Sequence, residues 1–403
     1  MKETIKKIVA KEILDSRGNP TVSVTISSEN FEASTDTPSG ASTGKYEAVE
    51  LRDGDKSRFN GKGVLKAVEN INKTIASALI GKDPLNQEEI DRIMLSLDGT
   101  PNKSNLGGNA TIAVSIAVLK LAAKISNKPL YEYIKETAKI KPSRKFPYLQ
   151  MNLVNGGQHA SSSLAFQEYH TIADTENLNE AIENIYRVQN ELKKTLKANT
   201  GDEGGFVPQM SEIEEPLVAF NKAVETVGLT GKVKYSLDVA SSSFFEDGLY
   251  DIGNKKITAE ELLSIYKDLC NKYPIISIED PFNEDDFEMF AKLKKEIPSI
   301  IVIGDDLTVT NKSKLQDAIK LNSVGGLIIK PNQIGTMTEV FETMKLARDN
   351  NINCVVSHRS GETNDDFIAD LAIGTGAYAV KFGALQRGER IAKYNRLSSI
   401  INY

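Results

Sequence analysis

Charged side chains recur in the second half of this sequence where short apolar runs end. The runs are VKYSLDVA, PIISIED, IIVIGDD, GGLIIK, NCVVSHRS and YAVK, and they contribute Asp238, Glu279, Asp305, Lys330, His358 with Arg359 and Ser360, and Lys381. Most of these runs are separated by segments with helical length and periodicity, which predicts repeated β-α units and a parallel sheet. Because the carboxyl ends of parallel strands meet on one face, we expect these side chains to converge.

The three carboxylates Asp238, Glu279 and Asp305 come from successive predicted strands. Oxygen ligands of this kind suit Mg²⁺, and no His/Cys spacing favours zinc. A single aspartate at a strand end more often caps a helix, which is our interpretation of Asp280 and Asp306. The recurrence over six consecutive strand ends favours a functional site.

Two further glutamates join the candidates: Glu168 in LAFQEYH and Glu203 in the glycine-rich TGDEGGF. The five acids and the cations Lys330, Arg359 and Lys381 sum to −2, which would repel an anion. One divalent cation brings the sum to 0 and two bring it to +2. The charge count therefore favours two metal ions and a polyanionic substrate.

The same residue types predict acid and base roles. A lysine that faces a metal and a second lysine has a lowered pKa and serves as a base. If Glu168 and Glu203 lie close together, their repulsion keeps one of them protonated as an acid. This combination predicts proton abstraction beside a carboxylate with loss of a leaving group. Among the histidines, His159 in NGGQHASS is a functional candidate, whereas His170 is interpreted as a packed or surface residue.

An eight-stranded β/α barrel would position these groups. The six strands above are joined by LQMNLV and SLAFQEYHTI upstream. Only NGGQHASS separates these two segments, which is too short for a parallel crossover. We therefore expect one antiparallel strand at the start of an otherwise parallel barrel.

The first part of the chain has a different pattern. Three short alternating segments, IVAKEILDS, PTVSVTISS and FEASTDTP, precede helical patterns, which is typical of an α+β domain. The polar stretch TAKIKPSRKFP marks a boundary. We expect an α+β capping domain over residues 1–138 and an α/β, TIM-type barrel over residues 139–403.

Composition excludes several classes of protein. The 403 residues are 40% hydrophobic and 26% charged, with a net charge of −6. This balance is globular and disfavours nucleic-acid binding. Two cysteines exclude a disulfide framework. We expect a cytoplasmic protein without a membrane segment, because the longest apolar stretch, residues 111–125, is short and carries Lys120 and Lys124.

Over nearly its full length the chain resembles the enolase family. The resemblance rests on long motifs: ILDSRGNPTV, PSGASTG, ELRDGD, GKGVLKAVENIN, LDGTPNKS, QE at 167–168, GDEGGF, SIEDPF, GDDLTVTN, IKPNQIG, SHRSGET and RIAKYN. It implies a (β/α)8 barrel with an atypical ββαα start, and the glycolytic, reversible dehydration of 2-phosphoglycerate to phosphoenolpyruvate. It also implies two Mg²⁺ ions per active site and a homodimer, with a higher oligomer as the alternative.

The resemblance implies a role for each matching residue. Lys330 removes the α-proton, and Glu203, with Glu168 beside it, protonates the departing hydroxyl. Asp238, Glu279 and Asp305 hold the first Mg²⁺, and Ser42 helps to place the second. The implied substrate contacts come from His159, Gln167, Glu168, Glu279, Asp305, Lys330, His358, Arg359, Ser360 and Lys381.

Departures from the family pattern lie around these residues. Gln158 and Ser161 replace the usual residues beside His159, and Phe382 follows Lys381 where threonine is common. They motivate an alternative hypothesis: an enolase-fold binding protein with little catalysis, including a cell-surface or secreted pool that binds host proteins. The ending in Tyr403, without a C-terminal lysine, counts against one such binding mode. A dehydratase of sugar acids is a third alternative, but it would not need PSGASTG.

Overall fold

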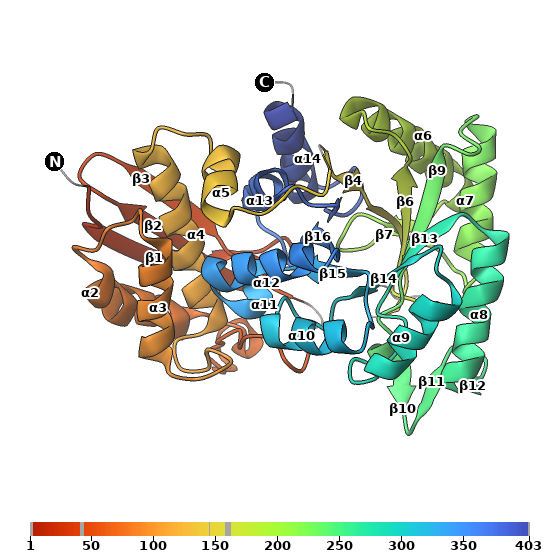
Figure 1. Cartoon of the computed structure of the whole chain (residues 1–403), viewed down its shortest axis with the longest axis horizontal. Coiled ribbons are helices and arrows are strands. Elements are labelled where there is room, and N and C mark those ends of the chain that lie inside the picture. Colours follow the sequence, from red (N-terminus) through yellow and green to blue (C-terminus); the bar gives the residue numbers. More distant parts are fainter. Residues whose placement is uncertain (1–2, 41–43, 145, 158–162, 402–403) are drawn as a thin grey trace.

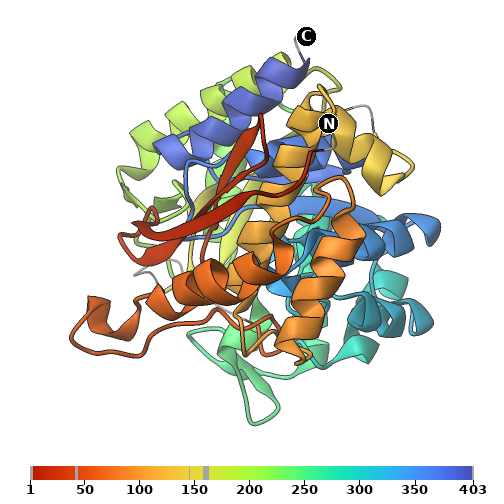
Figure 2. The same cartoon turned by 90° about the vertical axis from the view of Figure 1, so that its left-hand side faces the viewer.

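The computed structural model describes residues 3–40, 44–144, 146–157 and 163–401. A smaller N-terminal part lies beside a larger barrel, as Figures 1 and 2 show from two directions. The N-terminal part begins with an antiparallel sheet in the order β1-β2-β3, formed by Lys7–Leu14, Pro20–Ser27 and Glu32–Asp36. This is the predicted meander. Val22, Val24 and Ile26 of β2 are fully buried, and helix α4 packs against β2 and β3.

The helices of the N-terminal part follow the predicted apolar periodicity. They are α1 (Leu65–Glu69), which continues through a π-helical turn η2 (Asn70–Ile75) into α2 (Ala76–Leu79), then α3 (Gln87–Asp98), α4 (Gly108–Ile125) and α5 (Leu130–Ala138); a short turn η1 spans Phe59–Gly61. Helix α4 is long and apolar enough to cross a membrane, yet 83% of it is buried inside the protein. It therefore belongs to the core.

The larger part is an eight-stranded barrel. Tyr148–Leu149 (β4) and Met151–Asn155 (β5) flank Gln150 and act as one barrel strand. The other strands are β6 (Glu168–Ala173), β9 (Val233–Asp238), β13 (Ile275–Glu279), β14 (Ile301–Gly304), β15 (Gly326–Ile329), β16 (Asn353–Ser357) and β17 (Ala379–Lys381). The parallel pairing of β17 with β4 closes the barrel. Short strands β7 (Asn199–Thr200) and β8 (Phe206–Val207) extend the sheet beside β5.

Strand β6 is antiparallel to both of its neighbours, β5 and β9. This confirms the expectation of one reversed strand near the start of the barrel. The strand is shorter than predicted, because it begins at Glu168 and not near residue 163. Its reversal brings its first residue to the rim where the other strands end, with Glu168 opposite Asn155 on one side and Asp238 on the other.

Helices surround the barrel. Two of them, α6 (Leu178–Leu196) and α7 (Glu215–Thr226), lie consecutively between β6 and β9, which gives the predicted ββαα start. The others are α8 (Ala259–Lys272), α9 (Phe287–Glu296), α10 (Lys312–Lys320), α11 (Pro331–Ile334), α12 (Met337–Asp349), α13 (Phe367–Thr375) and α14 (Gly388–Ile401). After β9, a turn η4 (Ser241–Phe244) leads to a small sheet of β10 (Phe245–Glu246), β11 (Leu249–Asp251) and β12 (Lys256–Ile257).

A partly buried ion pair, with side chains that are 15% and 11% exposed, joins the N-terminal part to the barrel. Lys120 of α4 donates to both carboxylate oxygens of Asp365, at 2.8 and 2.6 Å, and the Asp36 amide also donates to Asp365 at 3.0 Å. Burial alone would raise the pKa of Asp365, but the Lys120 ammonium outweighs it and the pKa is lowered. The two parts are therefore held together partly by charge.

We expect Asp365→Asn to lower the free energy of unfolding by about 3 kcal/mol at neutral pH, because it leaves the Lys120 ammonium without a counter-charge. A lowered carboxyl pKa contributes stability above the unfolded value, about pH 4, and the contribution disappears as the pH falls further. The difference between the two proteins in urea denaturation should therefore shrink below about pH 4. A difference in the free energy of unfolding that is equal at neutral pH and below about pH 4 would contradict this prediction. The exposed pair Asp317–Lys320 gives the control, Asp317→Asn, with an expected loss below about 1 kcal/mol.

Candidate active site

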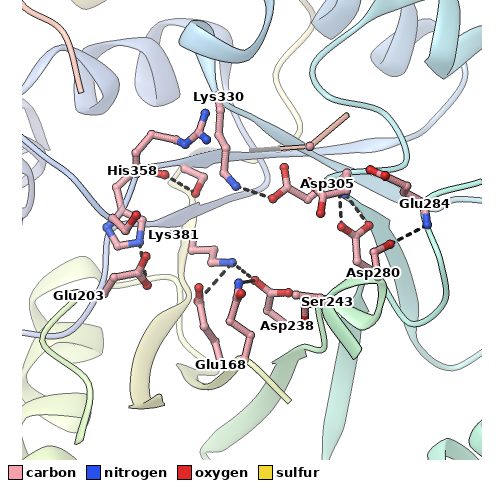
Figure 3. Close-up of a pocket in the computed structure, with 18 of the residues that line it drawn as sticks. Glu168, Glu203, Asp238, Ser243, Asp280, Glu284, Asp305, Lys330, His358 and Lys381 are labelled. Atoms are coloured by element: carbon pink, nitrogen blue, oxygen red, sulfur yellow. Dashed lines mark hydrogen bonds and ion pairs between the residues drawn. The ribbon is translucent and has the colours of Figure 1, made fainter. Parts of the chain in front are cut away.

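A pocket of about 350 Å³ opens at the rim where the strands end. Figure 3 shows side chains from several strands pointing into a shared space. The pocket is lined by ten of the predicted residues: Gln167, Glu168, Glu203, Asp238, Asp305, Lys330, His358, Arg359, Ser360 and Lys381. Glu279 lies behind this wall and is fully buried. The predicted residues Ser42 and His159, and the unusual Gln158 and Ser161, lie outside the described residues.

The β/α repeat explains this convergence. Asp238, Glu279 and Lys381 are the last residues of β9, β13 and β17. Lys330 directly follows β15, and its backbone begins helix α11 with Pro331 in the first turn. A proline there supplies a helix-compatible φ angle without losing a hydrogen bond, so the chain turns sharply at the lysine. The rim positions therefore follow from strand length and local turn chemistry.

Lys381 lies at the centre of the carboxylates (Figure 3). Its Nζ donates to Asp238 at 2.7 Å and to Glu279 at 2.9 Å, and it lies 3.2 Å from Glu168. Burial alone would lower the pKa of Lys381, yet these carboxylates raise it well above its usual value. The side chain is therefore a fixed cation that allows several acids to be buried together.

Glu279 has an unused oxygen. Its Oε1 accepts from Lys381, but its buried Oε2 has no hydrogen-bond partner in the described part of the chain. Burial and then the charge of Asp238 raise the pKa of Glu279 well above its usual range. A buried acceptor without a partner is costly, and a divalent cation would satisfy it.

Lys330 and Asp305 form a very close ion pair. Gln333 also donates to Asp305, at 2.9 Å. Burial alone would raise the pKa of Asp305, but Lys330 and then Lys381 lower it. Burial alone would lower the pKa of Lys330, but Asp305 raises it. A lysine that faces a metal is expected to have a lowered pKa, whereas the contact with Asp305 raises the pKa of Lys330.

Asp238, Glu279 and Asp305 fit a magnesium ion by their chemistry, since all three are oxygen donors around the same lysines. A second carboxylate group, Asp280, Asp305 and Asp306, has oxygens within 4.8 Å of one another. Asp280 accepts from the Asp305 and Asp306 amides at 2.9 and 2.7 Å, in the turn that follows β14. Neither Asp280 nor Asp306 caps a helix as predicted, because the N-caps of α9 and α10 are Asp286 and Asn311. Burial and Asp305 raise the pKa of Asp306 to about 8.

Glu203 lies at another wall of the pocket, on the loop between β7 and β8. The amide of Asn152 donates to it at 3.0 Å, and His358 Nε2 lies 3.4 Å away. Arg390 Nη1 donates to His358 Nδ1 at 2.8 Å. Because a guanidinium only donates, the proton of the neutral imidazole is on Nε2 and faces Glu203. Burial lowers the pKa of His358, and Arg390 adds to this effect against Glu203.

Arg390 is a residue that the sequence analysis did not single out. It is fully buried in α14. Besides His358, it donates to the carbonyls of Asp202, Arg359 and Ser360, at 3.0, 2.6 and 2.8 Å. One side chain thus ties together the loop of Glu203 and the loop after β16. Its quoted motif, RIAKYN, was the available signal.

We call the part of the pocket that is lined by Arg359 and Ser360 the cationic corner. Arg359 Nη1 and Nη2 contact the two Glu47 oxygens at 2.9 and 3.2 Å, and Nη1 also donates to Asn332 at 3.0 Å. Arg17 donates to Ser360 Oγ at 3.3 Å. Arg17 and Glu47 come from the N-terminal part, so both parts of the chain build this corner. Neither was singled out in the sequence, because nothing local in the sequence indicates these long-range pairs.

His170 is also more than the packed residue that the sequence suggested. It is fully buried, and its Nε2 lies 2.8 Å from Glu168 Oε2. Gln167, the neighbour of Glu168, donates to Asp238 at 3.4 Å. Phe382, which departs from the family pattern, is fully buried and packs edge-on against Tyr394.

Comparison with known proteins agrees with this geometry. Residues 143–402 match the family described as "Enolase, C-terminal TIM barrel domain", and residues 5–134 match "Enolase, N-terminal domain". The chain belongs to the enolase family. The chain is 47% identical to a protein named "Enolase" from Methanocaldococcus jannaschii, and the match covers 98% of this chain and 94% of the relative. It is also 47% identical to the protein named "Enolase" from Helicobacter pylori strain HPAG1, over 98% of this chain and 95% of the relative. The enolase of Campylobacter lari is 45% identical over 98% of this chain and 96% of its own length.

If the orphaned oxygen of Glu279 is a metal ligand in this enolase-family protein, Mg²⁺ should raise the melting temperature. Binding at one hundred times Kd stabilises a protein by about 2.7 kcal/mol. Glu279→Gln should abolish most of this shift. Its metal-free stability should not fall, because a carboxyl group with a raised pKa destabilises the fold at neutral pH.

Differential scanning fluorimetry with and without Mg²⁺ measures both effects. The control is Glu288→Gln, the same chemical change at an exposed position of α9. An equal Mg²⁺-dependent shift in the Glu279→Gln and Glu288→Gln proteins would rule out Glu279 as a ligand.

Proposed function

We propose that this protein is a working enolase that catalyses the reversible, Mg²⁺-dependent dehydration of 2-phosphoglycerate to phosphoenolpyruvate in glycolysis. The observation that supports this most strongly is the pocket wall where Lys330 contacts Asp305 while Lys381 contacts Asp238 and Glu279. These contacts support a base, a set of metal-binding oxygens and a fixed cation in one site. These are the chemical groups needed to remove a proton from the carbon beside a carboxylate.

Asp238, Glu279 and Asp305 would hold one Mg²⁺, and Ser42 is proposed for a second. Bound Mg²⁺ supplies positive charge that stabilises negative charge on the substrate carboxylate and opposes the ammonium form of nearby lysines. The charge count made from the sequence supports two ions, because its five acids and three cations sum to −2. A phosphorylated carboxylate needs a positive site.

Lys330 is proposed as the base. Its Nζ would take the proton from the carbon beside the substrate carboxylate after leaving its contact with Asp305. Arg359, which donates to Glu47 and Asn332, is proposed to bind the phosphate together with Ser360. Both line the pocket with Lys330, so phosphate and base would act on one substrate molecule.

Glu203 is proposed as the acid that protonates the departing hydroxyl, which leaves as water. The environments of the two glutamates support this division. Lys381 places a positive charge 3.2 Å from Glu168, whereas Glu203 faces the neutral amide of Asn152 and the imidazole of His358. Glu168 is assigned a supporting role beside it. The remaining proposed substrate contacts are His159, Gln167, Glu279, Asp305, His358 and Lys381.

Three further proposals concern organisation. We place the domain boundary at 138/139, since α5 ends at Ala138 and the next element begins at Tyr148. We propose a homodimer, supported by the family and by strand β1, which lies at a sheet edge and exposes Val9 and Leu14 by 42% and 56%. We propose cytoplasmic action, where the substrate of a glycolytic enzyme is found.

The direct test follows the absorbance of phosphoenolpyruvate when purified protein is given 2-phosphoglycerate and Mg²⁺. Activity should appear and should vanish with EDTA. Lys330→Ala should lower kcat by about 10²- to 10⁴-fold, the usual contribution of a general base. Lys320→Ala, at an exposed position of α10, is the matched control and should keep full activity. A folded wild-type protein without activity would refute the proposed function.

A further inference from the structure

The barrel interior directly below the rim has two different halves. On β14 to β17 the residues two positions before Asp305, Lys330, Ser357 and Lys381 are Ile303, Ile328, Val355 and Ala379. These four are buried and form an apolar cluster of their own. Since side chains two positions apart share a face of a strand, this cluster lies one layer below the pocket. Branched apolar residues are what a barrel interior usually contains.

The other half of this layer is polar. His170 lies two positions from Glu168, Ser236 two positions from Asp238, and Ser277 two positions from Glu279. The strand register places His170 opposite Ser236 and Ser236 opposite Ser277. We call His170, Ser236, Ser277 and Gln150, which joins them from between β4 and β5, the buried polar layer. None of the four is more than 4% exposed.

Hydrogen bonds run through this layer to the active site. Ser236 Oγ lies 2.6 Å from Ser277 Oγ, and Gln150 Nε2 donates to Ser236 Oγ at 3.1 Å. Gln150 Nε2 also lies 3.4 Å from His170 Nδ1. His170 Nε2 then reaches Glu168 Oε2 at 2.8 Å. The chain of contacts therefore ends on a carboxylate of the pocket.

The donors determine the state of the imidazole. An amide NH₂ group only donates, so Nδ1 of His170 is the acceptor and the proton lies on Nε2. That N–H points at the same Glu168 oxygen that faces Lys381 at 3.2 Å. One oxygen of Glu168 is thus held from below by His170 and from the side by Lys381.

We propose that His170 is a positioning residue for the dehydration: its Nε2–H holds the Glu168 carboxylate toward Lys381 and the pocket, and Gln150 holds the imidazole in the required tautomer. This inference rests on the proposed function. Polar groups in a barrel interior are costly unless each is hydrogen-bonded, and the apolar half shows that this layer packs without them. The polar half lies beneath the strands that carry Glu168, Asp238 and Glu279, and Gln150 joins it from the neighbouring strand.

The kinetic test compares two substitutions of His170 in the full-length protein with its Mg²⁺. His170→Met keeps the volume but removes the donor, and it should lower kcat about 10- to 100-fold, the usual cost of losing an outer-shell partner. KM should change less, because His170 contacts Glu168, whereas the phosphate is proposed to bind Arg359 and Ser360. His170→Gln places an amide N–H near the position of Nε2 and should recover most of the lost rate.

The matched control is Thr171→Val in the same strand. Thr171 is fully buried, and its hydroxyl has no hydrogen-bond partner among the described residues. Its side chain points to the other face of β6, since neighbouring residues of a strand alternate. This variant should keep the wild-type kcat, so that a general sensitivity of β6 to substitution is excluded.

A spectroscopic test does not depend on activity. The chain has only three histidines, so ring-labelled ¹⁵N histidine gives three sets of signals, which substitution at 159 and 170 assigns. The signals of His170 should show that Nε2 is protonated and that Nδ1 is not. Gln150→Met removes the donor to Nδ1, so the Nδ1 signal should shift toward that of an imidazole nitrogen without a hydrogen bond.

Three results would overturn the inference: an Nδ1-protonated His170 in the wild-type protein, an unchanged kcat in a folded His170→Met protein, or His170→Gln as slow as His170→Met. A wild-type protein that lacks activity would instead refute the proposed function, while the NMR result would still show whether His170 holds Glu168.

Discussion

Everything at the mouth of this barrel depends on balancing buried negative charge. Asp238, Glu279 and Glu168 surround Lys381, and Asp305 contacts Lys330. Without these cations the carboxylates would repel one another in a region that excludes water, at a cost of several kcal/mol for each uncompensated charge. The same carboxylates raise the pKa of both lysines, so each lysine keeps its proton. A divalent cation bound by the carboxylates would weaken their contacts with the lysines. Lys330 would then be able to act as a base.

The fold supplies this balance through its topology. Seven parallel strands bring their last residues to one rim, and the reversed strand β6 brings its first residue to the same place. Glu168 therefore lies directly opposite Asp238 in the sheet, although the two strands run in opposite directions. The reversal also aligns His170 with Ser236, one layer lower. A single change of strand direction thus positions both a carboxylate and the group beneath it.

The N-terminal part also contributes side chains to the active site. Glu47 pairs with Arg359, and Arg17 donates to Ser360, so the cationic corner is completed by residues far away in the sequence. The interface is itself held by charge, through Lys120 and Asp365. The site therefore requires both parts of the chain to be docked.

Much of the site could be predicted from the sequence, because polar residues at the ends of apolar runs have a regular signature. Asp238, Glu279, Asp305 and Lys330 were found this way, and the short link after LQMNLV predicted the reversed strand. Glu47 could not be found, since its contact with Arg359 joins residues that are distant along the chain, whereas Arg390 was signalled only by the motif RIAKYN. The raised pKa of Lys330 depends on its contact with Asp305, which the spacing of residues does not reveal.

His170 is an intermediate case, because the sequence contained only part of the signal for its role. A polar residue two positions from Glu168, in a strand whose residues are all buried, was a local signal of a shared face with the site. We interpreted it as packing because strand YHTIA gives no sign of which neighbours lie opposite. The register of β5, β6 and β9 supplies that information.

The most direct test of this account follows the hydrogen on the carbon beside the carboxylate of 2-phosphoglycerate in deuterated water with Mg²⁺. If Lys330 removes this proton and Glu203 acts separately on the leaving hydroxyl, Glu203→Gln should still exchange the hydrogen for deuterium while forming almost no phosphoenolpyruvate. Lys330→Ala should exchange none. Exchange that survives in Lys330→Ala, or disappears in a folded Glu203→Gln protein that binds substrate, would contradict this assignment of base and acid.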